Sequence, residues 1–497
     1  MKRLLLLSIF SLSVAVAACS GGDSGSSNGS SSSATTTERI VYLADQDIDG
    51  VSELYLAGSS IKLNPPLSRG KNVLDFQITP DKTAVVYRAD QDTNDVFELY
   101  RIEFANPGVS TKLNNSLPVG GDVWSAVITP DSSSVLYVAD QTTDGVNELY
   151  RVPFATPGVS AKLNGPLVPG GNVFFDIGTT ADSSAVVYRA TQATANIIEL
   201  YRVPLATPGV STKLNGVLPL NADVFIFPKI APDNSSVVYT VLQNFPMTPT
   251  TSDLYRVHFA TPGQSTKLNA PHSSFLRIIG QFDIEPDNSA VVYSIIDEAG
   301  DFRHLYRVPF ATPGQSTKLN GSGTDAFISS FAIRPDSSGA VYTGHRVSRS
   351  GANVEGTELY LVPFATPGVS TKLSGPLVAR GLVDSFAIAS DNSSVVYLAD
   401  ETTKDVLEIY RVPFATPGVS TKLNGPIVAG GGVDISNSGL GSEFTITPDS
   451  SAVLYRARQT TAGVSELYRV PFATPTVSTK LNGPLTSGGD VTRHIVQ

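Results

Sequence analysis

One phrase constrains this chain more than any other feature, because it recurs along almost the whole sequence. The phrase YRVPFATPGVSTKLNGP occurs complete at residues 410–426. Close copies begin at Tyr100, Tyr150, Tyr201, Tyr255, Tyr306, Tyr360 and Tyr468, and a degenerate copy begins at Tyr55. A repeat of this length indicates an array of similar structural units. The 497 residues therefore do not divide into domains by length alone.

A second landmark has the same count. A tyrosine preceded by Val or Leu closes an apolar run at Tyr42, Tyr87, Tyr137, Tyr188, Tyr239, Tyr293, Tyr342, Tyr397 and Tyr455. Each landmark occurs nine times, which predicts nine units.

Each unit contains four short β signals. In one of them these are residues 123–129, 134–139, 148–152 and 160–163, which are rich in β-branched and aromatic residues. The segment 156–159 reads Thr-Pro-Gly-Val, with Pro and Gly at the central positions of a type II turn. No window has a sustained helical period, and the 42 Gly and 33 Pro indicate frequent turns. Repeats built from paired helices are therefore excluded.

Tandem four-stranded units of this length predict an all-β chain folded as a β-propeller. The unit, with its PD turn, VVY strand and ELYRV strand, resembles the TolB-like propeller repeat over residues 38–497. It departs from that family after the PD aspartate, where the usual Gly is replaced by Ser, Asn or Lys. The resemblance implies partners in the cell envelope, such as a peptidoglycan-associated lipoprotein.

The two ends of the repeat region predict how the ring closes. The first unit starts at its second strand, residues 39–44, and lacks a PD turn. Residues 488–497 match residues 120 onward, where a first strand begins. We therefore expect a single ring of nine blades, with the C-terminal strand completing the N-terminal blade. Eight blades, or two smaller rings, are the alternatives.

The first 37 residues predict the cellular location of the protein. Lys2 and Arg3 precede an apolar run from Leu4 to Ala18, which is too short to cross a bilayer as a helix and reads as a secretory signal. The run ends in Val-Ala-Ala followed by Cys19, the only cysteine, and this resembles the lipobox of bacterial lipoproteins.

That resemblance implies cleavage after residue 18, a lipidated Cys19, and an outer-membrane or cell-surface location. Residues 19–37 then form a Ser- and Gly-rich tether, and residues 38–497 form the propeller. An ordinary signal peptide with a chance cysteine is the alternative.

Charge and motifs exclude several functions. The formal net charge of −10 argues against nucleic-acid binding, which needs a basic stripe. A single Cys excludes an intrachain disulfide and a Cys-based zinc site. There is no G-x-S-x-G elbow and no H-E-x-x-H spacing, and no P-loop or Rossmann signature follows a predicted strand, so we expect that the chain is not an enzyme. We also expect it to be a monomer.

The loops that vary most between units lie in units five to seven. Variable loops on a rigid scaffold often bind partners, and aromatic and Arg side chains are typical of interaction hot spots. The candidate partner-binding residues are Phe245, Met247, Phe275, Arg277, Arg303, His304, His345, Arg346 and Arg349. Neutral drift on tolerant loops is the alternative explanation.

Three loops between second and third strands predict calcium sites. The first carries Asp45, Asp47, Asp49 and Glu53, which resembles the DxDxDGxxD loops of calcium-binding blades in integrin α chains. The next two carry Asp90, Asp92, Asn94 and Glu98, and then Asp140, Asp144 and Glu148. Calcium prefers six to eight hard oxygen ligands, which such a loop supplies. Asp and Gly are also ordinary hairpin formers, so a purely structural role stays open.

These observations favour a cell-envelope lipoprotein whose propeller binds a protein or glycan through its variable-loop face. One alternative is a propeller enzyme, a lyase or hydrolase, with its site in the central channel. Another is a structural surface protein. Converging carboxylates and basic groups in the channel would favour the enzyme, and an uncharged channel would favour binding.

Overall fold

The computed structural model describes residues 38–59, 61–244, 251–270, 277–296, 303–321, 327–347, 354–435 and 443–497. Five of the predicted site residues, Cys19, Phe245, Met247, Phe275 and Arg349, lie outside these ranges. So do the predicted signal peptide and tether.

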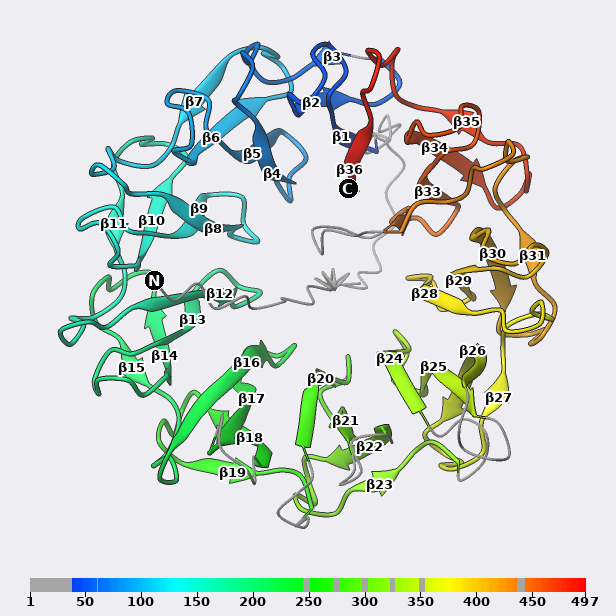
Figure 1. Ribbon diagram of the computed structural model, residues 1–497. Coiled ribbons are helices and arrows are strands. Elements are labelled where there is room, and N and C mark those ends of the chain that lie inside the picture. Colours follow the sequence, from blue (N-terminus) through cyan, green and yellow to red (C-terminus); the bar gives the residue numbers. More distant parts are fainter. Residues whose placement is uncertain are drawn as a thin grey trace, which may run out of the picture.

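The described residues form nine four-stranded antiparallel sheets arranged in a ring around a central channel, as Figure 1 shows. This confirms the predicted nine-bladed propeller. The elements are all strands, and none of the described segments is a helix that could cross a membrane. We number the blades one to nine along the chain, starting with the blade that contains β1.

The four strand positions of blades one to nine are as follows. The innermost strands are β36 (Val491–Val496), β4 (Val73–Ile78), β8 (Val123–Ile128), β12 (Val173–Thr179), β16 (Ala222–Ile230), β20 (Arg277–Ile284), β24 (Phe327–Ile333), β28 (Val383–Ile388) and β32 (Phe444–Ile446). The second strands are β1 (Ile40–Ala44), β5 (Ala84–Ala89), β9 (Ser134–Ala139), β13 (Ala185–Ala190), β17 (Ser236–Gln243), β21 (Ala290–Ile296), β25 (Gly339–Val347), β29 (Ser394–Ala399) and β33 (Ala452–Ala457).

The third strands are β2 (Glu53–Leu56), β6 (Glu98–Glu103), β10 (Glu148–Pro153), β14 (Glu199–Pro204), β18 (Thr251–His258), β22 (Arg303–Pro309), β26 (Val354–Pro363), β30 (Glu408–Pro413) and β34 (Glu466–Pro471). The outermost strands are β3 (Ile61–Lys62), β7 (Ser110–Lys112), β11 (Ala161–Lys162), β15 (Thr212–Lys213), β19 (Ser265–Lys267), β23 (Thr317–Lys318), β27 (Thr371–Lys372), β31 (Thr421–Lys422) and β35 (Thr479–Lys480).

The ring closes as the sequence predicts. In blade one, β36 pairs antiparallel with β1, and Tyr42 lies opposite His494. Beyond the last paired residues, Arg39 and Gln497 exchange two backbone hydrogen bonds of 3.0 Å. The C-terminal strand therefore supplies the inner edge of a blade whose other three strands come from the other end of the chain.

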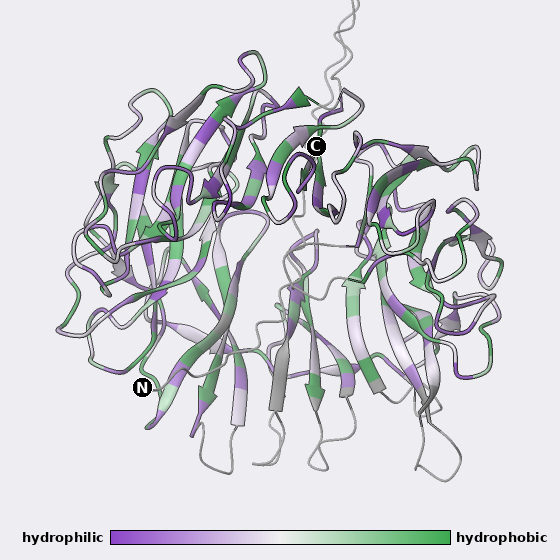
Figure 2. Ribbon diagram, turned by 45° about the horizontal axis from the view of Figure 1, so that its top comes forward, coloured by the Kyte–Doolittle hydropathy of each residue, from purple (hydrophilic) through white to green (hydrophobic). Residues whose placement is uncertain are grey.

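The core lies between neighbouring blades, where the second strands are almost completely buried. All six residues of β9 are buried, and each large cluster of buried apolar residues draws on adjacent blades. Figure 2 shows hydrophobic segments running through the strands around the ring. Strands buried on both faces account for the low charged content of 16%, against a usual ~25%.

The two sequence landmarks meet inside every blade. The tyrosine of the second strand stacks on the tyrosine of the third, with ring centroids 5.4 to 5.8 Å apart. In blade three these are Tyr137 and Tyr150, which face each other directly across the strand pair. One such pair in each blade explains why both landmarks have the same count.

The predicted type II turn is present between β10 and β11. Gly158 has a φ of +75°, and the Val159 N–H donates to the Thr156 carbonyl over 3.2 Å. The Gly158 N–H also donates to the carbonyl of Leu113 in the preceding blade, at 2.9 Å. The outer strand β11 is two residues long, shorter than the four predicted, because only Tyr150 and Arg151 of the third strand pair with it.

The PD turns form a second set of links between blades, which we call the turn ring. In blade three, Ser132 follows the PD aspartate with a φ of +56°, a conformation that normally favours glycine. Its hydroxyl accepts a 3.0 Å hydrogen bond from the backbone N–H of Asp81 in blade two. The same bond joins Asp131 to Ser183, Asp287 to Ser337 and Asp391 to Ser450. Where the residue is Asn the link differs: Asn234 accepts from the Ala181 N–H, one residue before the aspartate, and Asn288 and Asn392 donate to the carboxylates of Asp233 and Asp336.

This link explains why the usual glycine is missing. A glycine would relieve the backbone but would leave the neighbouring N–H without its side-chain acceptor. Blade two is the instructive exception, because blade one before it has no PD turn. Its residue at this position is Lys82, which interacts electrostatically with Glu38 at the start of blade one.

Candidate functional site

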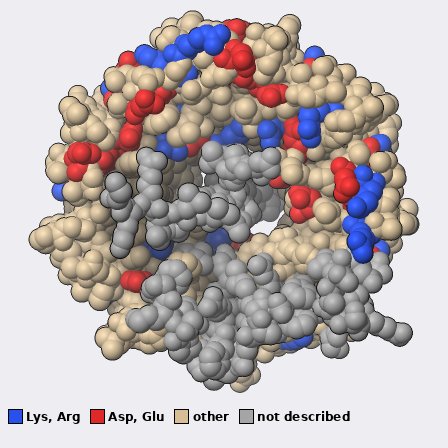
Figure 3. Space-filling view, viewed as in Figure 1, with Lys and Arg blue, Asp and Glu red and all other residues tan. Residues whose placement is uncertain are grey.

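The channel is lined by the innermost strands, which we call the channel wall. The exposed side chains among the described residues of these strands come one from each of six blades: Thr492, Trp124, Phe175, Phe227, Ser329 and Asp384. Figure 3 likewise shows acidic, basic and uncharged surface side by side around the inner rim. The wall therefore changes from blade to blade although the scaffold behind it is repeated.

Blade seven brings a serine and a histidine together on this wall. The Ser329 hydroxyl on β24 lies 2.5 Å from Nε2 of His345 on β25. The other ring nitrogen, Nδ1, lies 3.2 Å from the Thr357 hydroxyl on β26. Ser329 is exposed, His345 is half-buried and Thr357 is buried. A nucleophile in contact with a base, with the base held by a third group, is the arrangement that activates a serine for covalent catalysis.

Local strand geometry builds this triplet. The β24–β25 pairing shifts register between Ile328 and Phe331, so Ser329 lies at a β-bulge, a feature that re-aims side chains and is frequent beside active sites. His345 and Thr357 are direct partners across the next strand pair. The hairpin of β25 and β26 is also longer than in blade three, because its strands have nine and ten residues rather than six.

The repeat shows what blade seven has changed. Three residues after the strand-two tyrosine, blades two, three and eight carry Asp90, Asp140 and Asp400. Each of these carboxylates accepts a hydrogen bond from a backbone N–H at the start of its own blade's inner strand. Blade seven has His345 at this position. An acceptor that ties the hairpin to the inner strand has become an imidazole in contact with a serine.

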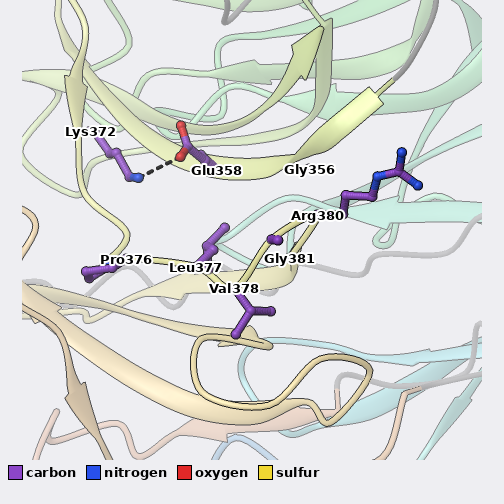
Figure 4. Close-up of a pocket in the computed structure, with 9 residues that line it drawn as sticks. Gly356, Glu358, Lys372, Pro376, Leu377, Val378, Arg380 and Gly381 are labelled. Atoms are coloured by element: carbon purple, nitrogen blue, oxygen red, sulfur yellow. Dashed lines mark hydrogen bonds and ion pairs between the residues drawn. The ribbon is translucent and has the colours of Figure 1, made fainter. Parts of the chain in front are cut away.

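A pocket of about 210 Å³ adjoins this site between blades seven and eight. Its lining includes Gly356, Glu358, Lys372, Leu377 and Arg380, shown in Figure 4. Glu358 and Lys372 form an ion pair of 2.6 Å, and the Arg380 side chain points away from that pair. The N–H of Thr357 donates to the Gly381 carbonyl over 3.3 Å, which joins this pocket to the serine–histidine site.

Arg380 is unusual for its backbone. Its φ is +60°, and the matching residue of other blades is Gly70, Gly120, Gly170, Asn221, Gly430 or Gly488. A long side chain in this conformation costs free energy that glycine or asparagine avoids.

The opposite part of the wall carries an aromatic pair. Trp124 on β8 and Phe175 on β12 stack with their centroids 5.5 Å apart and their planes 21° apart. They are 42% and 46% exposed.

Charged groups on the wall are mostly paired. Asp75 binds Arg88 in blade two, and Asp176 binds Arg189 in blade four. Lys229 and Asp283 form a 3.6 Å pair between blades five and six. In blade eight, removal of water raises the pKa of the Asp384 carboxyl, and the neighbouring Glu443 raises it further.

Three of the four predicted calcium ligands of the first loop, Asp45, Asp47 and Glu53, have protein partners, and Asp49 lies against Gly488. Oδ2 of Asp45 accepts a hydrogen bond from the Gly50 N–H at 3.1 Å. Asp47 and Glu53 both bind Nζ of Lys62, at 2.7 and 2.6 Å. These bonds occupy the oxygens that a metal would need, unless the lysine moves.

The other two loops follow the same pattern. Glu98 pairs with Lys112 and Glu148 with Lys162, while Asp90 and Asp140 accept backbone N–H groups. Asp92 lies 3.7 Å from Lys112. Asn94 donates to Asp95, and Asp144 lies against Gly120. Within the described ranges, no three His, Cys, Asp or Glu side chains are grouped to hold a metal ion. Calcium binding stays a prediction.

The predicted partner-binding residues that fall in described segments are spread over two blades. Arg277 begins β20 and Arg303 and His304 begin β22 in blade six, whereas His345 and Arg346 lie in β25 of blade seven. Only His345 is joined to the serine–histidine site. Ser329 and Thr357 were not predicted, and their one sequence signal is the exchange of the repeated Asp for His345.

No protein-family model matches the chain, and no curated protein is similar to it in sequence. Solved structures share its fold. A eukaryotic initiation factor is 9% identical with a TM-score of 0.53, and the match covers 93% of this chain and 98% of that one. Dipeptidyl peptidase 4 of Porphyromonas gingivalis is 8% identical with a TM-score of 0.54, covering 82% of this chain and 59% of that one.

An oligogalacturonate lyase from Vibrio parahaemolyticus is 16% identical with a TM-score of 0.43, covering 80% of this chain and 96% of that one. At these identities the likeness extends to the propeller fold alone. The expectation that the chain is not an enzyme is nevertheless wrong as an inference, because a solved structure that shares this fold is a peptidase. The absence of familiar catalytic motifs does not separate such propellers from binding proteins.

Proposed function

We propose that this chain is a hydrolase with its active site on the channel wall of blade seven. One observation carries the proposal: the exposed Ser329 hydroxyl is 2.5 Å from Nε2 of His345, whose other nitrogen is held by Thr357. This arrangement suits acyl transfer, in which a serine attacks an ester or amide carbonyl.

The residues have distinct roles in this scheme. Nε2 of His345 accepts the Ser329 proton as Oγ bonds to the acyl carbon, and the electron pair of the carbonyl moves to its oxygen. The carbonyl re-forms as the bond to the leaving group breaks, and the imidazolium returns its proton to that group. A water molecule, deprotonated by His345, then attacks the acyl-serine and releases the acid and free Ser329.

Thr357 is a positioning residue in this scheme. Its hydroxyl lies on Nδ1, so it orients the ring and leaves Nε2 facing Ser329. A threonine provides no negative charge to stabilise the imidazolium, unlike the aspartate of a serine–histidine–aspartate triad. We therefore expect a slower enzyme than such a triad gives.

The sequence supports an extracytoplasmic setting for this activity. If Cys19 is lipidated, the propeller is held at the cell envelope, where polymers are available as substrates.

The test is covalent labelling of the full chain with a fluorophosphonate probe, which reacts with activated serines, combined with hydrolysis of p-nitrophenyl acetate. We expect labelling at Ser329 and its loss in Ser329→Ala and in His345→Gln. The matched control is Ser330→Ala, because Ser330 is the next residue and bonds Thr343 instead of a histidine. Equal labelling of the parent chain and Ser329→Ala would contradict the proposal.

A further inference from the structure

The chain's only tryptophan is exposed in the channel, stacked on a phenylalanine from the next blade. Large aromatic side chains are normally buried, so two parallel rings that are both over 40% exposed need a reason. The pair lies on β8 and β12, which are neighbours on one side of the channel in Figure 1.

Hydrogen bonds around the rings hold the pair in place. The Ser125 hydroxyl donates to the Phe175 carbonyl over 2.9 Å, which ties β8 to β12 beside the two rings. Nη1 of Arg88 donates to the carbonyls of Val123 and Trp124, at 2.9 and 2.5 Å, and fixes the same strand from the other side. The platform is therefore pre-organised before any ligand arrives.

The electrostatic surroundings of the pair are neutral. Asp75 and Arg88 form an ion pair on one flank, and Asp176 and Arg189 form one on the other. Arg189 also lies 5.2 Å from the ring centre of Phe174. Among the described residues, the charged side chains that flank the rings are therefore paired with each other, which favours a neutral ligand over an ionic one.

We infer that Trp124 and Phe175 form a subsite for a neutral sugar ring. A pyranose presents an apolar C–H face that packs on an aromatic ring and a rim of hydroxyls that stays hydrated, and a pair of partly exposed rings on the channel wall suits both. A lipid surface or the face of a folded protein would meet the outer rims of the blades before it met these rings.

The position of this subsite also points to a substrate class for the proposed hydrolase. This second step of the inference rests on the proposed function. In Figure 1, β8 and β12 lie across the channel from β24, which carries Ser329. A substrate that reaches both has to be an extended chain. The geometry points to a neutral polysaccharide that bears ester groups, with sugar rings on the platform and an ester at Ser329.

The binding step is tested in Ser329→Ala, which keeps the full chain and removes turnover. Emission from the single tryptophan reports directly on the platform. The probes are neutral β-linked hexasaccharides, namely xylohexaose, cellohexaose and chitohexaose, with hexagalacturonate as the charged comparison and p-nitrophenol as a flat aromatic ligand. We expect a saturable change with at least one neutral sugar and a weaker one with hexagalacturonate.

The variant Phe175→Ala removes half of the platform and leaves the reporter. We expect it to raise the Kd for the neutral sugar by about tenfold, in line with the loss of one stacked ring. The control Val119→Ser changes a side chain that is 99% exposed outside the platform, and it should leave the Kd unchanged. The melting temperature of each variant shows whether it is folded.

The outcomes separate the two proposals. No response to any neutral sugar, or an unchanged Kd in Phe175→Ala, would overturn the sugar subsite. A response to p-nitrophenol alone would assign the platform to aromatic ligands and would also overturn it. Sugar binding without fluorophosphonate labelling of Ser329 would keep the subsite and remove the hydrolase.

Discussion

The turn ring and the channel wall are built on the same repeat and differ in almost every respect. In the turn ring, a Ser or Asn side chain after the PD aspartate repeatedly forms a hydrogen bond to the PD turn of the preceding blade. On the channel wall, matching strands present a tryptophan, a phenylalanine, a serine or an aspartate. The repeated contacts therefore serve the scaffold, and the differences between blades indicate where a ligand is handled.

The strongest test of this comparison replaces His345 in blade seven by the residue that other blades carry at the same position. The variant His345→Asp restores the residue that blades two, three and eight carry. We expect ester hydrolysis to fall by about a thousandfold or more, because the base is lost, while the melting temperature changes little. Hydrolysis rates and a thermal melt of the same samples check this. Retained activity would show that blade seven is not the catalytic blade.

A second pair of variants tests whether the channel wall of blade four tolerates the residues that blade three carries at the same positions. Arg189→Val should cost about 3–5 kcal/mol of unfolding free energy, because it leaves the buried carboxylate of Asp176 without its partner. The double variant that adds Asp176→Ser copies Val138 and Ser125 of blade three and should recover most of the loss. Chemical denaturation measures both, and a double variant as unstable as the single one would contradict this account.

Blade one, which closes the ring, provides a test through the pH dependence of stability. His494 is buried beside Arg456 and Arg493, and both ring nitrogens lack a hydrogen bond. Burial, with the two arginines, lowers the pKa of His494 to about 3. Five other blades have phenylalanine at this position opposite the strand-two tyrosine: Phe76, Phe282, Phe331, Phe386 and Phe444.

The unfolded chain protonates this imidazole near pH 6.5 and the folded one only near pH 3, so the unfolded state binds more protons between these values. The free energy of unfolding therefore has its full value, as far as His494 is concerned, above pH 6.5. It decreases as the pH falls from 6.5 toward 3. We expect about 1.4 kcal/mol lost per pH unit in that window, and a smaller slope in His494→Phe. Denaturant midpoints at pH 7 and pH 5 test it, and equal slopes in both proteins would count against it.

The smallest effect belongs to the turn ring. Ser132→Ala removes the acceptor for the Asp81 N–H and keeps a side chain at positive φ, so it should cost about 1 kcal/mol. Ser183→Ala should cost the same amount, because it breaks the same bond one blade further on. Denaturant midpoints compare the two. A clear difference between the two losses of unfolding free energy would mean that geometrically equal hydrogen bonds in the turn ring do not contribute equally to stability.

The sequence was sufficient for the fold because the repeat contains its own landmarks. Tyrosines such as Tyr137 and Tyr150 mark the second and third strands, and their stacking makes the blade count readable. The closing strand was predictable because residues 488–497 match a first strand elsewhere in the chain.

The candidate site was less predictable because it depends on contacts between strands. Ser329 reaches His345 only through a bulge, and Trp124 meets Phe175 only because two blades are neighbours. Acidic residues such as Glu53 and Glu148 suggest calcium by their spacing, but that spacing does not show that Lys62 and Lys162 lie beside them.

The strand β36 has a consequence for the order of assembly. Blade one combines residues 40–62 with residues 491–496, so the ring cannot shut until the last of these has been synthesised. Until then β1 offers an unpaired edge, and the inner strands of the eight other blades are available to fill it, in the same chain or in another copy. A protein made of near-identical blades thus carries a built-in route to exchanged dimers, and His494 facing Tyr42 is one of the few features that mark the correct partner.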